Sequence, residues 1–197
     1  MYKRQLLSSL PYDEKDIGEK IGYTDLNMDG EAYYRRLTME PTFNIAGIRS
    51  GYTGDHAKTI IPATATVNID MRLVVDQNPA DIFDKVKRHV HAFDPDNEVA
   101  YRGAMHPSRT PSDLEIVRVV TDAVGEAYGK TPLVQPSMPG SLPDYVWTKI
   151  LETPSIIMPY ANFDQHNHSP NENLKVEHFF NGIKCTCHLI KVLGERR

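Results

Sequence analysis

Hydrophobic and polar residues alternate strictly over residues 65–73. Because successive side chains of a strand point to opposite faces, this period of two predicts a strand with one apolar face. The apolar face holds Ala65, Val67, Ile69, Met71 and Leu73. Arg72 therefore lies on the opposite, polar face. Residues 42–48 alternate in the same way and predict a preceding strand, and a glycine-rich loop at residues 50–55 follows it.

Apolar residues recur at helical spacing in the next segment. Asn78-Pro79-Ala80-Asp81 supplies an N-cap, a proline at the first helical position and an acid in the first turn, which predict a helix start. The apolar stripe of this helix comprises Ile82, Phe83, Val86, Val90 and Phe93. Residues 98–101 predict a returning strand, and residues 13–17 and 29–34 predict two earlier helix starts. This order predicts a small α+β sandwich, one helical layer on an antiparallel sheet.

A polar stretch with two prolines, residues 105–111, predicts a domain boundary. Beyond it, Ser112-Asp113-Leu114-Glu115 has the form of a capping box and predicts a helix that ends at Gly129. Further along, we expect a short strand near 133–134, a helix from about Asp144, a buried strand at 155–158 and a long final helix after residue 173. The chain thus divides into predicted domains 1–104 and 105–197.

Charge and composition narrow the classes of partner. The 197 residues include 22 basic and 26 acidic ones, a net charge of −4, which gives no basic footprint for nucleic acid or a membrane surface. No apolar run is long enough to span a bilayer, and the basic start of the chain turns polar too soon for a signal peptide. Cys185 and Cys187 lie two residues apart in a predicted helix, so their side chains diverge and free thiols are expected. We expect a soluble, cytoplasmic protein.

The densest polar cluster is the loop from Asp164 to Glu172, which contains His166 and His168. Neutral imidazole is a good zinc ligand, and a loop after a buried strand is a common place for functional groups. The alternative is a solvated loop that only leads into the next helix, because zinc needs three or four ligands.

Two further groups are candidates for substrate binding. A guanidinium on the open face of a strand, such as Arg72, can hold a carboxylate through two parallel hydrogen bonds, although a surface ion pair is the plainer interpretation. The loop around Gly140 and Ser141 could offer a backbone N–H and a hydroxyl to a ligand. It is not the Gly-x-Ser-x-Gly turn of a serine hydrolase.

Taken in order, several motifs resemble one family of zinc peptidases. They are Glu40-Pro41-Thr42, Ala57-Lys58-Thr59-Ile60-Ile61-Pro62-Ala63, Ile69-Asp70-Met71-Arg72-Leu73-Val74, Pro139-Gly140-Ser141 and His168-Ser169-Pro170-Asn171-Glu172. The family includes aminoacylase, acetylornithine deacetylase, carboxypeptidase G and carnosine dipeptidase, and the dipeptidase branch is the most similar in pattern. The resemblance implies a ferredoxin-like α+β dimerisation (lid) domain at residues 1–104. The C-terminal α/β part of a zinc-aminopeptidase-like catalytic domain would follow at residues 105–197.

The resemblance also implies a role for individual residues. His168 would be the last metal ligand of a two-zinc site, and Arg72 would bind the substrate carboxylate. Thr59 would reach the substrate, within its own subunit or across the dimer, and Gly140 and Ser141 would border it. No role is implied for His166.

Other parts of such a site are missing from this sequence. The family uses an upstream His-x-Asp and a Glu-Glu pair, and neither motif occurs in these 197 residues. The chain therefore contains no predicted catalytic residue, and we expect it to be part of a longer enzyme and inactive alone. The implied protein is a homodimeric, cytoplasmic dizinc hydrolase of dipeptides or N-acyl amino acids.

Two other hypotheses remain open from the sequence. The chain could be a non-catalytic dimerisation or binding module that keeps the peptidase fold. It could also be an unrelated α+β domain whose His-x-His loop is incidental.

Overall fold

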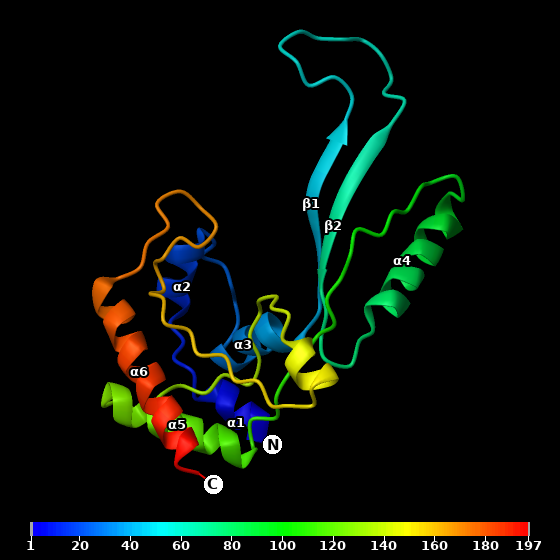
Figure 1. Cartoon of the computed structure of the whole chain (residues 1–197). Helices are drawn as coiled ribbons and strands as arrows, with labels where there is room; N and C mark the ends of the chain where they lie inside the picture. Colours follow the sequence, from blue (N-terminus) through cyan, green and yellow to red (C-terminus); the bar gives the residue numbers. More distant parts are fainter. Residues whose placement is uncertain (1, 197) are drawn as a thin grey trace. The chain divides into compact units, whose positions relative to one another are not determined.

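The computed structural model describes residues 2–196, and for Tyr2 and Lys3 the backbone alone. Met1 and Arg197, the outer ends of the two predicted domains, lie outside the described residues. The elements are α1 (Tyr2–Ser8), α2 (Glu14–Ile21), α3 (Gly30–Met39), β1 (Thr42–Ser50), β2 (Ala65–Arg72), α4 (Pro79–Phe93), α5 (Glu115–Tyr128), the π-helix η1 (Val146–Ile150) and α6 (Val176–Gly194) (Figure 1). No helix among the described residues is both long and apolar enough to cross a membrane.

The chain folds into two compact units that interleave along the sequence. Unit 1 contains residues 1–31, 110–136 and 153–197, and unit 2 contains residues 32–109 and 137–152. These units are compact groups of contacts, and the division into domains 1–104 and 105–197 stays a prediction.

The sheet of unit 2 is the antiparallel hairpin β1–β2, and its register depends on a β-bulge. Ile45 pairs with Ile69, but the next pair is Gly47 with Asn68, so Ala46 is the extra residue. Without it, Ile48 would lie opposite Thr66 on the polar face. The bulge instead places Ile48 opposite Val67 and keeps the apolar face continuous.

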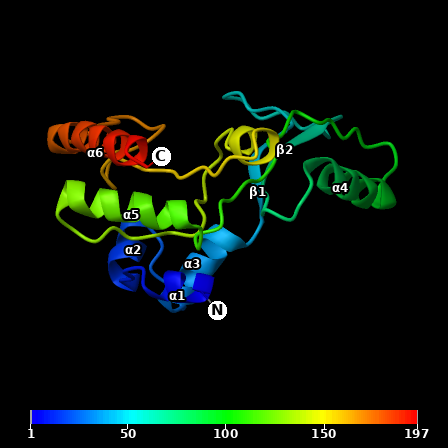
Figure 2. The same ribbon diagram turned by 60° about the horizontal axis from the view of Figure 1, so that its bottom comes forward.

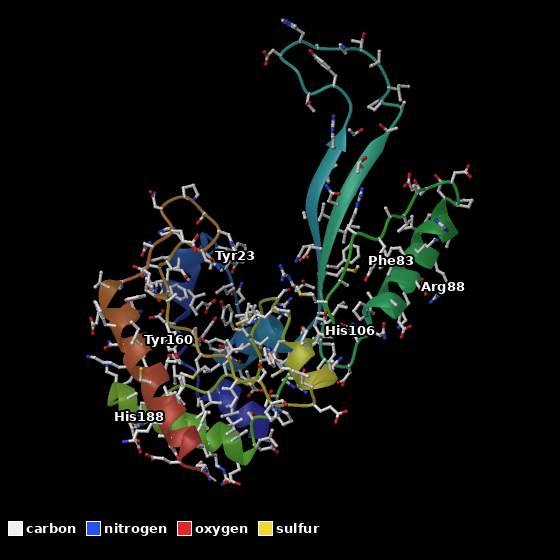
Figure 3. All side chains as sticks on the ribbon, viewed as in Figure 1. Tyr23, Phe83, Arg88, His106, Tyr160 and His188 are labelled. Atoms are coloured by element: carbon white, nitrogen blue, oxygen red, sulfur yellow. The ribbon has the colours of Figure 1, made fainter. Side chains whose placement is uncertain are left out.

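This apolar face is not the buried core that its alternation predicts. Within the described residues of unit 2, Ile45 is 60% exposed, Ile48 69% and Ile69 40%. The helix α4 begins as predicted, with the Asn78 side chain accepting a hydrogen bond from the Ala80 N–H at 2.9 Å. Phe83 of α4, labelled in Figure 3, contacts Tyr101 in the segment after the helix. The two rings meet edge to face, with their centres 5.0 Å apart.

Unit 1 has its core between α5 and α6, which lie side by side in Figures 1 and 2. The buried residues at this contact are Val120, Ala123, Cys185 and Leu189. Tyr160 lies beside α6, where its hydroxyl is 2.8 Å from that of Thr186 (Figure 3). Gly182 makes this approach possible, because a Cβ there would lie 2.9 Å from Cγ of Tyr160. The packing face of α6 is therefore formed by Gly182, Cys185 and Leu189.

Two kinds of predicted detail are wrong. Residues 98–101, 133–134 and 155–158 are not strands, because none has a hydrogen-bonded strand partner among the described residues. The helix expected from about Asp144, by contrast, is present as the π-helical segment η1. Ser112 does not cap α5: Leu114 is the N-cap, and residues 112–114 form a separate turn after Pro111. The predicted end of α5 is confirmed, with Gly129 in the left-handed conformation at φ 63°.

Leu189→Ala should destabilise unit 1 strongly. Leu189 is 8% exposed in the contact between α5 and α6, and truncating a buried leucine costs about 2–4 kcal/mol of unfolding free energy. Leu193→Ala, on the same helix and 40% exposed, is the matched control and should cost about 1 kcal/mol or less. Urea unfolding followed by circular dichroism measures both, and equal losses would contradict the assigned core.

The two cysteines should differ in reactivity. Cys185 is fully buried and burial raises the pKa of its thiol, whereas Cys187 is exposed. Alkylation of the native chain, followed by peptide mass mapping, should modify Cys187 first and Cys185 only after unfolding. Early modification of Cys185 would show that α6 does not pack in this orientation.

Candidate functional site

Arg72 and Ser141 are two of the predicted substrate-binding residues, and the structure brings them together within unit 2. Nη1 of Arg72 donates a hydrogen bond to Oγ of Ser141. Nε of Arg72 donates to Oδ2 of Asp70 at 3.0 Å, so the guanidinium is held from two sides. The Arg72 side chain is still 47% exposed. An arginine carries five N–H donors, so donors on Nη2 remain for a ligand.

The polar face of the hairpin supports this arginine. Asp70 and Arg72 share that face because they are two residues apart on β2, and their partners on β1 are Asn44 and Thr42. Oγ1 of Thr42 accepts hydrogen bonds from the Arg72 N–H at 3.3 Å and from Asn44 Nδ2 at 3.1 Å. Asp70 was not among the predicted site residues, although its i, i+2 spacing to Arg72 is a visible signal.

The loop that carries Gly140 and Ser141 is anchored just after them. Oγ of Ser108 donates to Oδ2 of Asp144 at 2.8 Å and also meets Oγ1 of Thr148, which ties the segment before residue 110 to η1. A Cβ on Gly140 would lie 2.8 Å from Cε of Met138, so this position is closely packed by its own loop.

Thr59 is exposed in the loop of residues 51–64, which joins β1 to β2. This loop has its own packing: the ring of Tyr52 lies over Gly54, where a Cβ would come within 2.5 Å of Cζ, and Nζ of Lys58 lies 4.3 Å from the ring centre. Arg72 is at the other end of the hairpin. The strand from Ala65 to Arg72 rises about 3.3 Å per residue and so spans about 23 Å. The loop that contains Thr59 and the end of β2 that contains Arg72 are therefore at opposite ends of the hairpin (Figure 1).

His168 lies in unit 1, at the third position of a four-residue turn. The turn is closed by the Ser169 N–H, which donates to the His166 carbonyl at 3.0 Å. His168 has φ 61°, the left-handed region that this position of a type II turn requires. Its side chain is exposed, and its ring nitrogens make no hydrogen bond or ion pair within the described part of the chain. An exposed imidazole with free nitrogens fits the requirement for a metal ligand.

The loop around His168 is organised by Asn162, which is 2% exposed. Asn162 Nδ2 donates to Asp164 Oδ1 at 2.8 Å and to Asn173 Oδ1 at 3.0 Å. The hydrogen bond from Asn162 is the main cause that lowers the pKa of the Asp164 carboxyl, and nearby Lys175 acts in the same direction. Asp164 therefore stays ionised at neutral pH, and its contribution to the loop is lost as the pH falls through the lowered pKa. No local sequence signal singles out Asn162.

Within residues 2–196, no three His, Cys, Asp or Glu side chains gather as a metal-binding group. His168 fits a metal centre as a single ligand, and His166 is also exposed, at φ 54°. The two groups of predicted residues also belong to different units. Arg72, Thr59, Gly140 and Ser141 are in unit 2, and His168 is in unit 1.

Comparison with known proteins gives a consistent set of relatives. Residues 4–98 match the model of the M20 peptidase dimerisation domain. The chain is 27% identical over 200 residues to the Cys-Gly metallodipeptidase dug1 of Schizosaccharomyces pombe, an alignment that covers 96% of this chain and 41% of the relative. A Cys-Gly metallodipeptidase of Candida albicans is 21% identical over 91% of this chain and 39% of its own length. The chain thus spans about two fifths of the length of these curated relatives.

Solved structures are also similar to this chain over nearly its whole length. The M20 family metallo-carboxypeptidase of Sulfolobus solfataricus is 27% identical, with a TM-score of 0.89 over 97% of this chain and 44% of that protein. Because the family model, the curated relatives and this structure agree, the third hypothesis, an unrelated α+β domain, is excluded. Residues 4–98 thus match the peptidase dimerisation domain, and the chain as a whole is similar to M20 family metallopeptidases.

Proposed function

We propose that this chain is part of a two-zinc amide-bond hydrolase that acts on dipeptides or N-acyl amino acids. In this proposal it supplies the dimerisation domain, the binding site for the substrate carboxylate and one metal ligand. The observation that carries the proposal is the contact between Arg72 and Ser141, which joins two candidate substrate-binding residues from distant parts of the sequence. The remaining metal ligands and the general base belong to residues outside this chain. Residues 105–197 are assigned to the catalytic domain.

Arg72 and Ser141 together form a site for a carboxylate. The ion pair with Asp70 restrains the guanidinium, while donors on Nη2 stay available for a ligand oxygen. Ser141 accepts from Arg72 through Oγ, so its own proton can be donated to the second oxygen. A substrate held by its free carboxylate presents its amide bond in one direction. This contact contributes to orientation rather than to bond breaking.

His168 would hold one of the two zinc ions through a neutral ring nitrogen. When bound, the zinc pair supplies a polarised carbonyl and a water of lowered pKa. His168 itself takes no part in proton transfer, because a ring that binds metal through one nitrogen is not an available base at that nitrogen. The exposed position of the ring at the tip of its turn is what makes it accessible for this role.

Thr59 acts in this proposal on the substrate of a second subunit. The hairpin holds Thr59 and Arg72 of one chain at opposite ends, so both contact one substrate only if they come from different copies. A homodimer through the dimerisation domain, two sites per dimer, follows from this arrangement. A cytoplasmic location is part of the proposal, because both cysteines are free thiols.

Replacing Arg72 by lysine should remove most of the recognition of the substrate carboxylate. In the longer protein that the proposal requires, Arg72→Lys should lower kcat/KM for a dipeptide by about ten- to hundredfold, since the charge-assisted hydrogen bond from Nη2 to the carboxylate is lost. With a C-terminally amidated dipeptide, the same variant should differ little from the parent. Arg49→Lys, on the same hairpin face but paired with Thr66, is the matched control. An equal loss on both substrates would contradict carboxylate binding by Arg72.

A mixed-subunit assay tests the role of Thr59. Subunits with Thr59→Ala and subunits with Arg72→Ala should each be nearly inactive as homodimers. In a mixed dimer, one of the two sites would receive Arg72 from the first subunit and Thr59 from the second, so activity should return toward half of the parent value. A mixed dimer as inactive as either homodimer would mean that Thr59 does not act across the interface. The non-catalytic binding module, the competing hypothesis, predicts no amide hydrolysis by any of these proteins.

A further inference from the structure

We infer that Asn162 is a positioning residue for metal binding, holding the loop of residues 162–175 in the conformation that presents His168 to a metal ion. The inference rests on the proposed function, which makes His168 a ligand. Asn162 is 2% exposed, whereas His166, His168 and most other residues of the loop are exposed. Because buried polar side chains are nearly always hydrogen-bonded, the partners of Asn162 indicate which parts of the loop it holds together.

The Asn162 side chain joins the beginning of the loop to its end. Its Oδ1 accepts a hydrogen bond from the Lys175 N–H at 3.0 Å. Its Nδ2 donates to Asp164 Oδ1 at 2.8 Å and to Asn173 Oδ1 at 3.0 Å. The side-chain amide of Asn162 therefore contacts both the segment before the His168 turn and the segment after it.

Asn173 extends the same connection toward the turn. Its Nδ2 donates to the carbonyl groups of Asp164 at 3.2 Å and Asn171 at 3.0 Å, and its N–H donates to the Gln165 carbonyl at 2.9 Å. The residues on either side of the turn thus form a hydrogen-bonded base. The turn from His166 to Ser169 projects from this base.

The turn needs such a base because its backbone is unfavourable by itself. His166, His168 and Asn171 have φ angles of 54°, 61° and 65°, in the left-handed region that non-glycine residues rarely adopt. Such conformations persist where the surrounding structure determines them. The His168 ring has no hydrogen-bond partner within the described residues, so the backbone, which fixes the direction of the Cα–Cβ bond, is what the loop holds in place. Loss of Asn162 would release that backbone and scatter the direction of the ring.

The network itself can be tested in the 197-residue chain by amide hydrogen exchange. Asn162→Ala should speed the exchange of the Ser169, Asn173 and Lys175 amides and leave those of α5 unchanged. Asn167→Ala is the matched control: it lies in the same turn, is exposed and makes no side-chain hydrogen bond within the described residues. Asn173→Ala, which removes an exposed member of the network, gives a second variant if Asn162→Ala does not fold. Unchanged exchange in a folded variant would overturn the inference.

The effect of the Asn162 hydrogen bonds on metal binding can be tested with Co²⁺ as the probe metal in the longer protein. Asn162→Ala, or Asn173→Ala in its place, should weaken Co²⁺ binding about ten- to hundredfold, as expected when a residue that orients a ligand is removed. The visible spectrum of the bound Co²⁺ should change as well, whereas Asn167→Ala should leave affinity and spectrum unchanged. Parent-like affinity and spectrum in a variant whose loop exchanges fast would overturn the inference. His168→Ala separates the two claims: if that variant also binds Co²⁺ like the parent, it is the metal-ligand role in the proposed function that fails.

Discussion

The hydrogen bond between Arg72 and Ser141 is the contact on which the interpretation of unit 2 depends. It joins the end of β2 to a loop 69 residues later in the sequence, and it does so on the polar face of the hairpin. The β-bulge at Ala46 keeps that face separate from the apolar one over the whole length of the hairpin. Asp70 restrains the guanidinium from the other side. The proposed carboxylate site would thus be assembled from a strand, its neighbouring strand and a distant loop.

Alternation and helical spacing predicted the elements whose signals are local. The face of Arg72, the start of α4 at Asn78 and the end of α5 at Gly129 agree with the structure, because each is decided by residues within one or two turns of chain. The predictions of strands at residues 98–101 and 155–158 were wrong, because an apolar segment forms a strand only where a neighbouring strand can pair with it. The contact of Ser141 with Arg72 follows from tertiary structure, and periodicity alone could not have found it.

The same distinction applies to the two parts of the candidate site. His168 stands out in the sequence through its neighbours, but the residue that organises its loop, Asn162, does not, because its importance lies in hydrogen bonds that reach Lys175. The two units also differ in how far their apolar side chains are buried. Unit 1 buries Cys185 and Leu189 between two helices, whereas the apolar face of the hairpin in unit 2 remains open in this chain. The predicted α+β sandwich is more accurate for the order of the elements than for the covering of the sheet, because the apolar face of the hairpin is exposed.

The most direct test of the account is a crystal structure of the longer protein with zinc and a non-hydrolysable dipeptide, using anomalous scattering to locate the metal. We expect a zinc ion about 2.0–2.1 Å from a ring nitrogen of His168, with the ligand carboxylate bound by Arg72 and Ser141. Zinc ions bound without His168, or a ligand carboxylate held by other residues, would contradict it.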